Sequence, residues 1–359
     1  MKLLDRYIAR QFLVTFLFAG ISFTALFILI NLVDNFDEFV DRGISTDRMA
    51  VYYLNCLPET FLTTTPLSVL LAAMFVTGKL SMQSELPAMK SAGASLSMLL
   101  KPFAIVSLFI TGFNIVNACW IVPSTYDRAR GFEKFYIKNN GHIEDVGTLH
   151  IRESNNRLLT IGRLAPDRNS GTLVSLEQFN GYHIASRTDA DSFRYSPSTR
   201  QWVFFNTRTR HFTGETENLR INHGADTLKL SFTSESFRMM NAEPDQMNLL
   251  QHYQYITQQQ HAGLSGLGRA IVKFHTKIAF PFASMIIILI GVPLSTRKKR
   301  GGLALEASIS LIAGFLYLGM QRTLSTIGYQ GVIDPVLAAW LPNILFLCVG
   351  LLLCTSANK

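Results

Sequence analysis

The stretch Phe12–Val33 reads FLVTFLFAGISFTALFILINLV and contains no charged residue. A helix needs about 20 consecutive, mostly apolar residues to cross a hydrocarbon core roughly 30 Å thick, and this stretch is long enough. It is also longer than the roughly 7–15 apolar residues of a signal-peptide core, and no A-x-A-like cleavage site follows it. The sequence therefore predicts an uncleaved transmembrane helix.

Five further stretches have the same character. They are Thr60–Leu80, Leu96–Val122, Phe274–Leu294, Leu303–Thr326 and Val332–Cys354. The composition agrees, because 48% of the 359 residues are hydrophobic and only 16% are charged, whereas a soluble domain carries about 25% charged residues. We therefore predict six transmembrane helices in a 3+3 arrangement, with a polar insert between the third and the fourth.

The loop charges predict the orientation, since Lys and Arg accumulate on the cytoplasmic side. With both termini inside, the cytoplasmic cations are Lys2, Arg6, Arg10, Lys79, Lys90, Lys101, the run Arg297–Arg300 and Lys359. The loop predicted after the first span is acidic, with Asp34, Asp37, Glu38, Asp41 and Asp47 against Arg42 and Arg48. Much of the net charge of +8 then faces anionic head groups, so it requires no nucleic acid.

The polar insert between the third and fourth spans has the pattern of a β domain. Its short apolar runs are Leu149–Ile151, Leu158–Ile161, Leu173–Leu176 and Trp202–Phe205, and Thr227–Phe232 alternates. Turn-forming residues separate the runs at Ser154–Asn156, Pro166–Gly171, Asn180–Gly181 and Ser196–Ser198. Such spacing is typical of a sandwich, a jelly roll or an open barrel.

The predicted division of the chain has three parts. Residues 1–122 hold the first three spans, residues 123–272 form the outer β domain, and residues 273–359 hold the last three spans. Within the insert, Met247–Gln260 is predicted to be a helix that returns the chain to the membrane. The predicted class is a membrane all-α protein with an inserted, outward-facing β domain.

Several kinds of catalytic motif are missing from the sequence. Gly78-Lys79 lacks the upstream glycine of a phosphate-binding loop, and no HExxH motif occurs. The histidines between His142 and His275 have no metal-ligand spacing, and neither have Cys56, Cys119, Cys348 and Cys354. A disulfide between Cys56 and Cys119 is sterically open, but we do not expect it. No pair of carboxylates lies deep in a span, as an ion-coupled carrier would commonly show. We predict a non-enzymatic transport subunit without a cofactor or metal, energised by another chain.

The predicted cytoplasmic segment Gln83–Gly93 is the candidate site for that other chain. Ser84 is a candidate N-cap, Leu86 and Met89 are spaced i, i+3, and Gly93 suits a helix end. The alternative interpretation is a plain connector between two spans.

At this segment the sequence resembles a known family. Gly78-Lys79-Leu80, followed by Ser84-Glu85-Leu86, Met89 and Ala92-Gly93, is similar to the coupling-helix signature of the LptF/LptG (YjgP/YjgQ) permeases of lipopolysaccharide export. Leu4–Ile8 resembles the start of LptG chains rather than of LptF chains. Further similarities lie at Pro66-Leu67, Trp120, Pro123, Tyr195, Pro197, Trp202, Lys277-Ile278 and Pro281.

The resemblance implies a permease subunit of an ABC-type exporter in the inner membrane of a Gram-negative bacterium. An LptF-like and an LptG-like chain would form a heterodimer on an LptB-like ATPase dimer, which binds the ATP. The heterodimer would extract lipopolysaccharide and pass it to LptC-like and LptA-like bridge proteins in the periplasm, and its β domains would be jellyroll-like. The residues Ser84, Glu85, Leu86, Met89 and Gly93 would then couple the chain to the ATPase.

Lipopolysaccharide carries phosphates above acyl chains, so cations near the outer interface are candidate contacts. Arg130, Lys134 and Lys138 are four residues apart, and Arg130 matches a basic position of the family. Lys273 and Lys277 are spaced i, i+4 at the start of the fourth span, and Arg322 lies inside the fifth span. Asn31 stands where some LptG chains place a lysine. Contact with lipid head groups or solvent is the simpler interpretation for the Arg130 group and for Lys273 and Lys277. Arg322, inside a span, is a functional candidate by default, although its side chain is long enough to reach the interface.

Three alternatives remain open on the sequence. The chain is an LptF-like paralogue of the same complex, an ion-coupled secondary transporter, or a membrane scaffold whose β domain binds partners only. Co-purification with an ATPase separates the transporter from the scaffold, and ion dependence without ATP favours the carrier.

Overall fold

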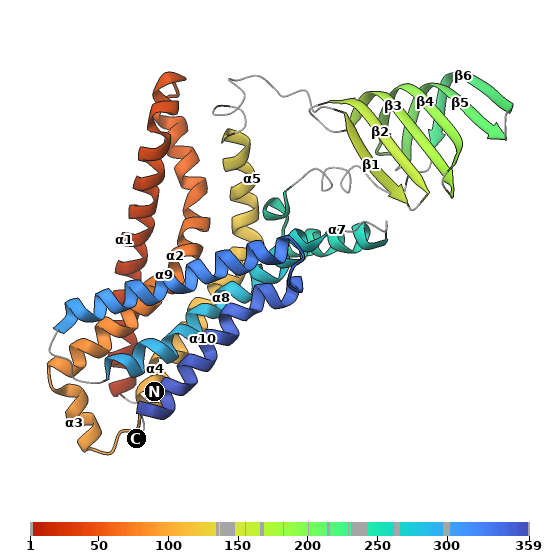
Figure 1. Cartoon of the computed structure of the whole chain (residues 1–359). Coiled ribbons are helices and arrows are strands. Elements are labelled where there is room, and N and C mark those ends of the chain that lie inside the picture. Colours follow the sequence, from red (N-terminus) through yellow and green to blue (C-terminus); the bar gives the residue numbers. More distant parts are fainter. Residues whose placement is uncertain are drawn as a thin grey trace. The chain divides into compact units, whose positions relative to one another are not determined.

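The computed structural model describes residues 3–133, 136, 148–154, 156–165, 169–181, 183–199, 201–213, 216–228, 230, 243–261, 266–296 and 302–357. The chain forms two compact units (Figure 1). The helical unit contains Met1–Ile137, Pro244–Leu249 and Gly268–Lys359, and the β unit contains Lys138–Glu243 and Leu250–Leu267.

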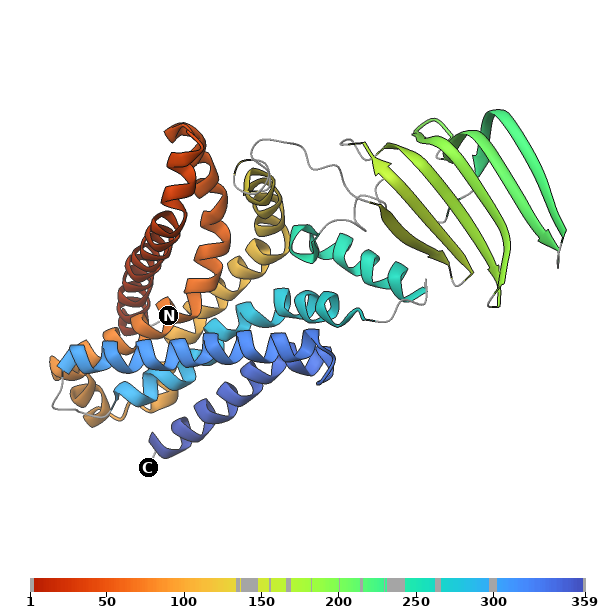
Figure 2. The ribbon, with the colours of Figure 1, turned by 45° about the horizontal axis from the view of Figure 1, so that its top comes forward.

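The helical unit consists mainly of long helices. In chain order they are α1 (Leu3–Asp41), α2 (Thr46–Met82), α3 (Glu85–Ser91), α4 (Leu96–Val116), the π turn η1 (Asn117–Ile121), α5 (Val122–Phe132), the short helix η3 (Pro244–Gln246), α8 (Gly268–Ser295), α9 (Gly302–Tyr329) and α10 (Pro335–Ala357). The helices α1 and α2 pack along each other (Figure 2).

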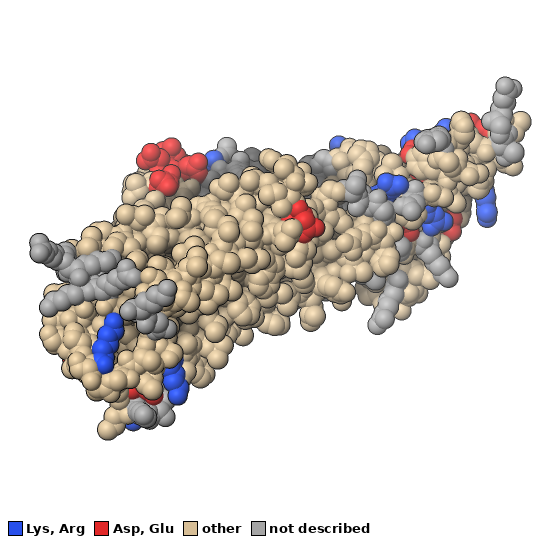
Figure 3. Space-filling model, turned by 60° about the horizontal axis from the view of Figure 1, so that its bottom comes forward, with Lys and Arg blue, Asp and Glu red and all other residues tan. Residues whose placement is uncertain are grey.

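Five helices in the described part of the chain are long and apolar enough to cross a membrane. They are α1, α2, the continuous run α4–η1–α5, α8 and α10. The helix α9 covers the fifth predicted span over 28 residues but is not among the five, so the count of six spans stays a prediction. One face of the helical unit shows few charged side chains over a wide area (Figure 3).

The first two helices are longer than predicted. At 1.5 Å per residue, the 39 residues of α1 span about 58 Å, nearly twice a hydrocarbon core. The acidic stretch from Asp34 to Asp41, predicted as a loop, forms the last turns of α1 instead. The physical reason is tertiary packing, because Phe39 is 1% exposed and forms a small core with Tyr52 and Ala129.

The main core fills the space between α1, α2, α4 and α8. Its central side chains include Phe12, Leu70, Met74, Phe103 and Ile287, all of them buried. The rings of Phe12 and Phe103 lie 5.0 Å apart, which joins α1 to α4. Core burial of this kind explains why the apolar runs of the sequence predicted these helices well.

Buried polar side chains tie α8, α9 and α10 together. The hydroxyl of Tyr317 on α9 donates to Oδ1 of Asn343 on α10 at 2.9 Å. The amide of Asn343 donates in turn to the carbonyl of Ala279 on α8 at 2.5 Å. Because the interior of a membrane protein offers little water, such groups stabilise the bundle only when they are paired.

The β unit contains a six-stranded antiparallel sheet in the order β1-β2-β3-β4-β5-β6. Its strands are β1 (Leu149–Ser154), β2 (Arg157–Leu164), β3 (Ser170–Asn180), β4 (His183–Ser196), β5 (Gln201–Thr213) and β6 (Thr216–Leu228). The predicted β texture is confirmed, and the turn at Gly181 has a φ of 64°, which suits glycine. The described strands follow chain order as a meander, so a jellyroll-like fold stays a finer prediction.

One face of the sheet carries an apolar core. Its most buried members include Leu159, Ile161, Val174, Phe193 and Trp202. The rings of Phe193 and Trp202 lie 5.0 Å apart. The predicted alternating strand at Thr227–Phe232 extends β6 only to Leu228 among the described residues. The predicted return helix is α7 (Leu249–His261), which belongs largely to the β unit.

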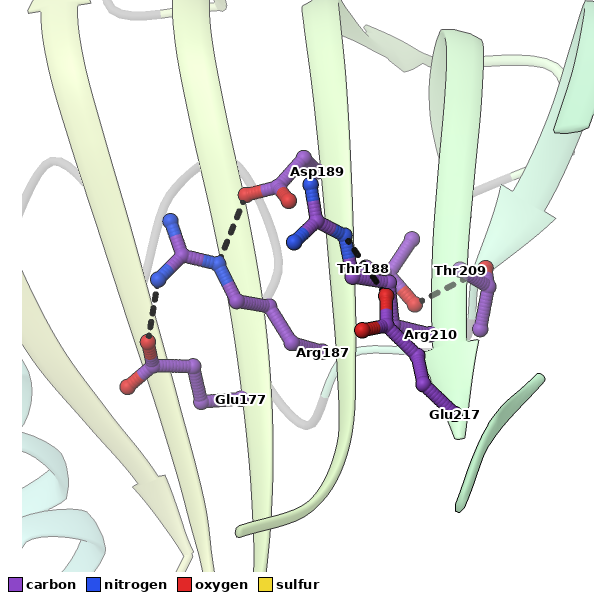
Figure 4. Close-up of polar contacts among 7 residues, drawn as sticks. All are labelled: Glu177, Arg187, Thr188, Asp189, Thr209, Arg210 and Glu217. Atoms are coloured by element: carbon purple, nitrogen blue, oxygen red, sulfur yellow. Dashed lines mark hydrogen bonds and ion pairs between the residues drawn. The ribbon is translucent and has the colours of Figure 1, made fainter. Parts of the chain in front are cut away.

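Charged side chains link β3 to β4 and β5 to β6, and a hydrogen bond between Thr188 and Thr209 links β4 to β5 (Figure 4). Arg187 pairs with Glu177 at 3.1 Å and with Asp189 at 2.9 Å. Arg210 pairs with Glu217 at 3.5 Å. Partly exposed pairs of this kind each contribute at most about 1 kcal/mol, so they support the strand register while the apolar face stabilises the sheet.

Candidate functional site

The helix α3 forms the end of the helical unit at which coupling residues were predicted. It ends in a Schellman motif, in which Gly93 N–H donates to the carbonyl of Lys90 at 3.0 Å and Ala94 N–H donates to that of Met89 at 3.0 Å. Gly93 has a φ of 83°, a backbone conformation that glycine adopts without strain. The predicted end of the short helix is therefore confirmed.

The start of α3 differs from the prediction. Ser84 stands at the N-cap position, but its φ is 62° and its side chain makes no capping hydrogen bond. The turn between α2 and α3 consists of Gln83 and Ser84 only, and this tightness holds Ser84 in the left-handed region. The side-chain cap instead occurs at α4, where Ser95 Oγ accepts from Met98 N–H at 3.3 Å.

The two apolar coupling residues face the protein's own interior. Leu86 is 3% exposed and belongs to the main core, and Met89 packs against that core. Glu85 is half-buried, and the hydroxyl of Tyr7 donates to its Oε1 at 3.4 Å. A partner that docks here therefore contacts Glu85 and the exposed Pro87 of α3. Leu86, on the buried side of the helix, anchors α3 in the main core.

A cavity of about 550 Å³ lies beside α3. Its lining combines apolar residues of α1, α3 and α4, including Ile8, Leu86 and Leu99, with the cations Lys90 and Lys101. The lining shows that the N-terminal part of α1 lies next to the predicted coupling segment.

The opposite end of the helical unit contains a polar pocket between α1, α2 and α5. It has a volume of about 270 Å³. Its lining includes Asn31, Tyr52, Glu59, Arg130 and Glu133. Two predicted substrate contacts, Asn31 and Arg130, therefore line one pocket although 99 positions separate them in the chain.

The helical unit also contains an apolar cavity of about 700 Å³. It is lined from α1, α2, α4 and η1 by residues that include Leu29, Leu57, Phe61 and Phe113. Ile28 lines both cavities. The site can thus accommodate a molecule that has a polar head and apolar chains.

Arg130 is the cation of the polar pocket, and it is engaged by its own helix. Its Nη1 pairs with Oε2 of Glu133, and its Nε donates to the hydroxyl of Tyr126 at 2.8 Å. The guanidinium carbon also lies 5.1 Å from the centre of the Tyr126 ring. The side chain of Arg130 nevertheless remains 35% exposed, so a ligand can reach it.

The other predicted cations lie elsewhere. The Nζ of Lys273 pairs with Oδ2 of Asp245, and that of Lys277 donates to the carbonyl oxygens of Pro244 and Met247. These contacts fasten the segment around η3 to α8. Arg322 lies exposed on α9, and Lys134 and Lys138 lie outside the described residues. Cys56 and Cys119 are both free thiols.

A model of the lipopolysaccharide export system permease LptF/LptG family matches residues 6–355. The chain belongs to this family. It is similar to the lipopolysaccharide export system permease protein LptG of Haemophilus influenzae, with 22% identity over 349 residues, which is 96% of each chain. It is also similar to the corresponding protein LptF of Escherichia coli K12, with 24% identity over 353 residues, 97% of this chain and 93% of that protein.

Family membership together with the five apolar helices makes the chain a multi-pass inner-membrane protein. The resemblance found in the sequence is thereby confirmed at the level of the family. The two identities are too close to separate an LptG-like from an LptF-like chain.

Three residues that hold Arg130, directly or through Glu133, were not predicted as site residues. Tyr126 and Glu133 flank Arg130 at spacings of four and three residues, and this helical spacing was a usable signal. Tyr52 belongs to α2, and nothing in the sequence connects it to Glu133, to which its hydroxyl donates at 2.9 Å.

Proposed function

We propose that this chain is a lipopolysaccharide-transporting permease subunit of an ABC-type exporter. The observation that carries the proposal is the polar pocket around Arg130 together with an apolar cavity of about 700 Å³ that shares the lining residue Ile28 with it, in a chain of the LptF/LptG family. Phosphate groups bind to arginine through charge-assisted hydrogen bonds, and acyl chains gain free energy by leaving polar surroundings.

In this proposal the energy comes from another subunit. An LptB-like ATPase dimer binds the ATP and contacts the α3 end through Glu85 and the exposed face of the helix, so this chain is non-catalytic and needs no cofactor. Leu86 and Met89 transmit the movement because they anchor α3 in the main core.

The remaining partners follow from the same proposal. A second permease of the LptF/LptG type completes the cavity. The β unit is a jellyroll-like domain in the periplasm that passes lipopolysaccharide to LptC-like and LptA-like bridge proteins, and both termini are cytoplasmic. The start of the chain at Leu4–Ile8 favours the LptG-like role, and the LptF-like role is the alternative.

Photo-crosslinking from inside the apolar cavity tests the proposed function. A photoreactive amino acid at Phe113, which lines the cavity, should capture lipopolysaccharide in the assembled complex, and ATP should lower the yield. Leu352 on α10 is the matched control, because it is an exposed apolar residue outside that lining. Equal yields at the two positions, or no effect of ATP, would contradict the proposal.

Cysteine labelling tests the proposed orientation. A cysteine at Lys299 should react with a reagent supplied from the cytoplasm, and a cysteine at Asn222 in the β unit should not. Cytoplasmic labelling of Asn222→Cys would invert the orientation and exclude an export role for the β unit.

A further inference from the structure

We propose that Glu133 acts as an internal substitute for the phosphate of the cargo. In the empty permease it binds Arg130, and an incoming phosphate must displace it. This inference rests on the proposed function, because it concerns how the same pocket binds and releases a phosphorylated lipid.

The first support is the arrangement around the guanidinium. Arg130 pairs with Glu133 one helical turn away, while Tyr126 accepts a hydrogen bond from Nε at 2.8 Å and offers its ring at 5.1 Å. The ion pair therefore uses one edge of the guanidinium, and Tyr126 fixes the orientation of the group. Glu133 takes Nη1 and Tyr126 takes Nε, so a phosphate that pairs with Nη1 competes directly with Glu133 for that nitrogen.

The second support is that Glu133 is held from a different helix. Its Oε1 accepts a hydrogen bond from the hydroxyl of Tyr52 on α2 at 2.9 Å, while its Oε2 faces Arg130. Tyr52 is itself 3% exposed, and its ring lies 5.1 Å from that of Phe132 and 6.0 Å from that of Phe39. Both carboxylate oxygens thus have protein partners, so the pair is positioned by the fold.

The third support is the chemistry of exchange. A carboxylate and a phosphate both offer paired oxygens that suit a guanidinium. Leaving a partly buried charge without a partner is costly, but here one anion replaces another and Arg130 is never unpaired. Glu133 should therefore weaken the binding of the phosphate and speed its release, and a transporter needs both effects.

Lys273 and Lys277 are less suited than Arg130 to bind a phosphate that comes and goes, because their present contacts hold the backbone together. Lys273 pairs with Asp245, and Lys277 donates to two backbone carbonyls. Those contacts join α8 to the segment around η3, so breaking them would detach a piece of chain. The Arg130–Glu133 pair joins α5 to the residue that caps its C-terminus, so a rotation of the Glu133 side chain that also breaks its hydrogen bond to Tyr52 opens the pair without moving a segment of the backbone.

The test measures binding of two lipid probes to the assembled exporter in nanodiscs. The probes are bisphosphorylated lipid A and the same lipid after phosphatase treatment. Glu133→Gln keeps the size of the side chain and an oxygen for Tyr52 but removes the charge. It should raise the affinity for the phosphorylated probe roughly three- to tenfold and slow its dissociation, without changing the affinity for the dephosphorylated probe.

Three further comparisons keep the test decisive. Tyr52→Phe removes only the hydroxyl that holds Glu133 and should act in the same direction with a smaller effect. Glu38→Gln, an exposed carboxylate on α1 outside the pocket lining, is the matched control and should change neither affinity. In an Arg130→Gln background, Glu133→Gln should lose its effect on the phosphorylated probe.

The outcomes separate this inference from the proposed function. Unchanged or weaker binding of the phosphorylated probe by Glu133→Gln would overturn the inference, as would an equal change for both probes. If the wild-type exporter binds neither probe, the proposed function fails first.

Discussion

At the α3 end of the helical unit, Leu86 is 3% exposed and belongs to the main core. At the α5 end, Arg130 is 35% exposed and is held by Glu133 and Tyr126. The first end thus fixes its functional segment by apolar burial, and the second fixes its functional residue by polar contacts that a ligand can replace. Burial of a leucine contributes roughly 1.5–3 kcal/mol and no solute competes for it. Charged contacts near a surface are weakened by salt and by competing ions.

This difference suits the two proposed tasks. A segment that receives force from an ATPase must not slip against the helices that it moves, and a cargo site must let its ligand leave. The first three predictions test whether apolar burial holds the α3 end more firmly than polar contacts hold the α5 end. The fourth compares apolar burial with polar contacts in the β unit, and the order runs from the largest expected effect to the smallest.

Leu86→Ala should have the largest effect on the helical unit. Removing a buried leucine side chain costs about 2–5 kcal/mol, so thermal unfolding of the purified complex should begin at a lower temperature. ATPase activity should also lose its coupling to transport, because α3 is no longer anchored. Ala88→Ser on the exposed side of α3 is the control, and a similar loss in both variants would show that α3 is merely fragile.

Arg130→Glu should strongly lower crosslinking of lipopolysaccharide in the cavity. The change places a third carboxylate beside Glu59 and Glu133 in the polar pocket, and like charges there repel a phosphate. The measurement is the crosslink yield per assembled complex. Arg128→Glu, on an exposed position of α5, should leave the yield unchanged, and an unaltered yield for Arg130→Glu would remove this residue from the site.

Glu85→Ala should weaken association with the ATPase while membrane insertion stays intact. A charged contact costs a few kcal/mol when it is buried in an interface and less at its rim, and Glu85 is half-buried before any partner binds. Co-purification of the ATPase at increasing salt is the measurement. Tyr7→Phe removes only the long hydrogen bond to Glu85 and should have little effect. Wild-type retention of the ATPase by Glu85→Ala would contradict the docking role.

Arg187→Ala should have the smallest effect. Its pairs with Glu177 and Asp189 are partly exposed, so the loss of stability should be at most about 1 kcal/mol and should shrink at high salt. Trp202→Ala in the buried face of the same sheet should cost about 3–5 kcal/mol. A larger effect of Arg187→Ala than of Trp202→Ala would reverse our view of what stabilises the sheet.

Much of the fold could be predicted because it depends on local patterns. Apolar runs mark the membrane helices, and turn residues such as Gly181 and Gly93 mark the ends of strands and of α3. The prediction failed where distant packing or the geometry of a tight turn decides. The acidic end of α1 is helical because Phe39 packs on Tyr52, and Ser84 loses its capping role because its turn is so short.

The candidate site was predicted as a set of cations together with Asn31. Arg130 and Asn31 were predicted as substrate contacts. Glu133, the ion-pair partner of Arg130, was not predicted as a site residue, because phosphate contacts are expected to be cations and Glu133 is an anion. Tyr52 lies 81 positions before Glu133, and only the packing of α2 against α5 brings the two together. A sequence shows its charged residues directly, whereas the contacts that hold them depend on packing between segments that are distant in the chain.

The π turn η1 determines the direction in which the side chains of α5 point. It interrupts the run from α4 to α5 with five residues, and it is anchored where Asn117 donates to the carbonyl of Pro58 on α2 at 3.0 Å. A π turn holds one residue more than an α turn, and each residue of an α-helix advances the direction of its side chains by about 100°. Deleting a single residue from η1 would therefore rotate Arg130 and Glu133 together by roughly a quarter of a circle. The ion pair would survive intact within α5, but it would point away from Tyr52 and out of the pocket.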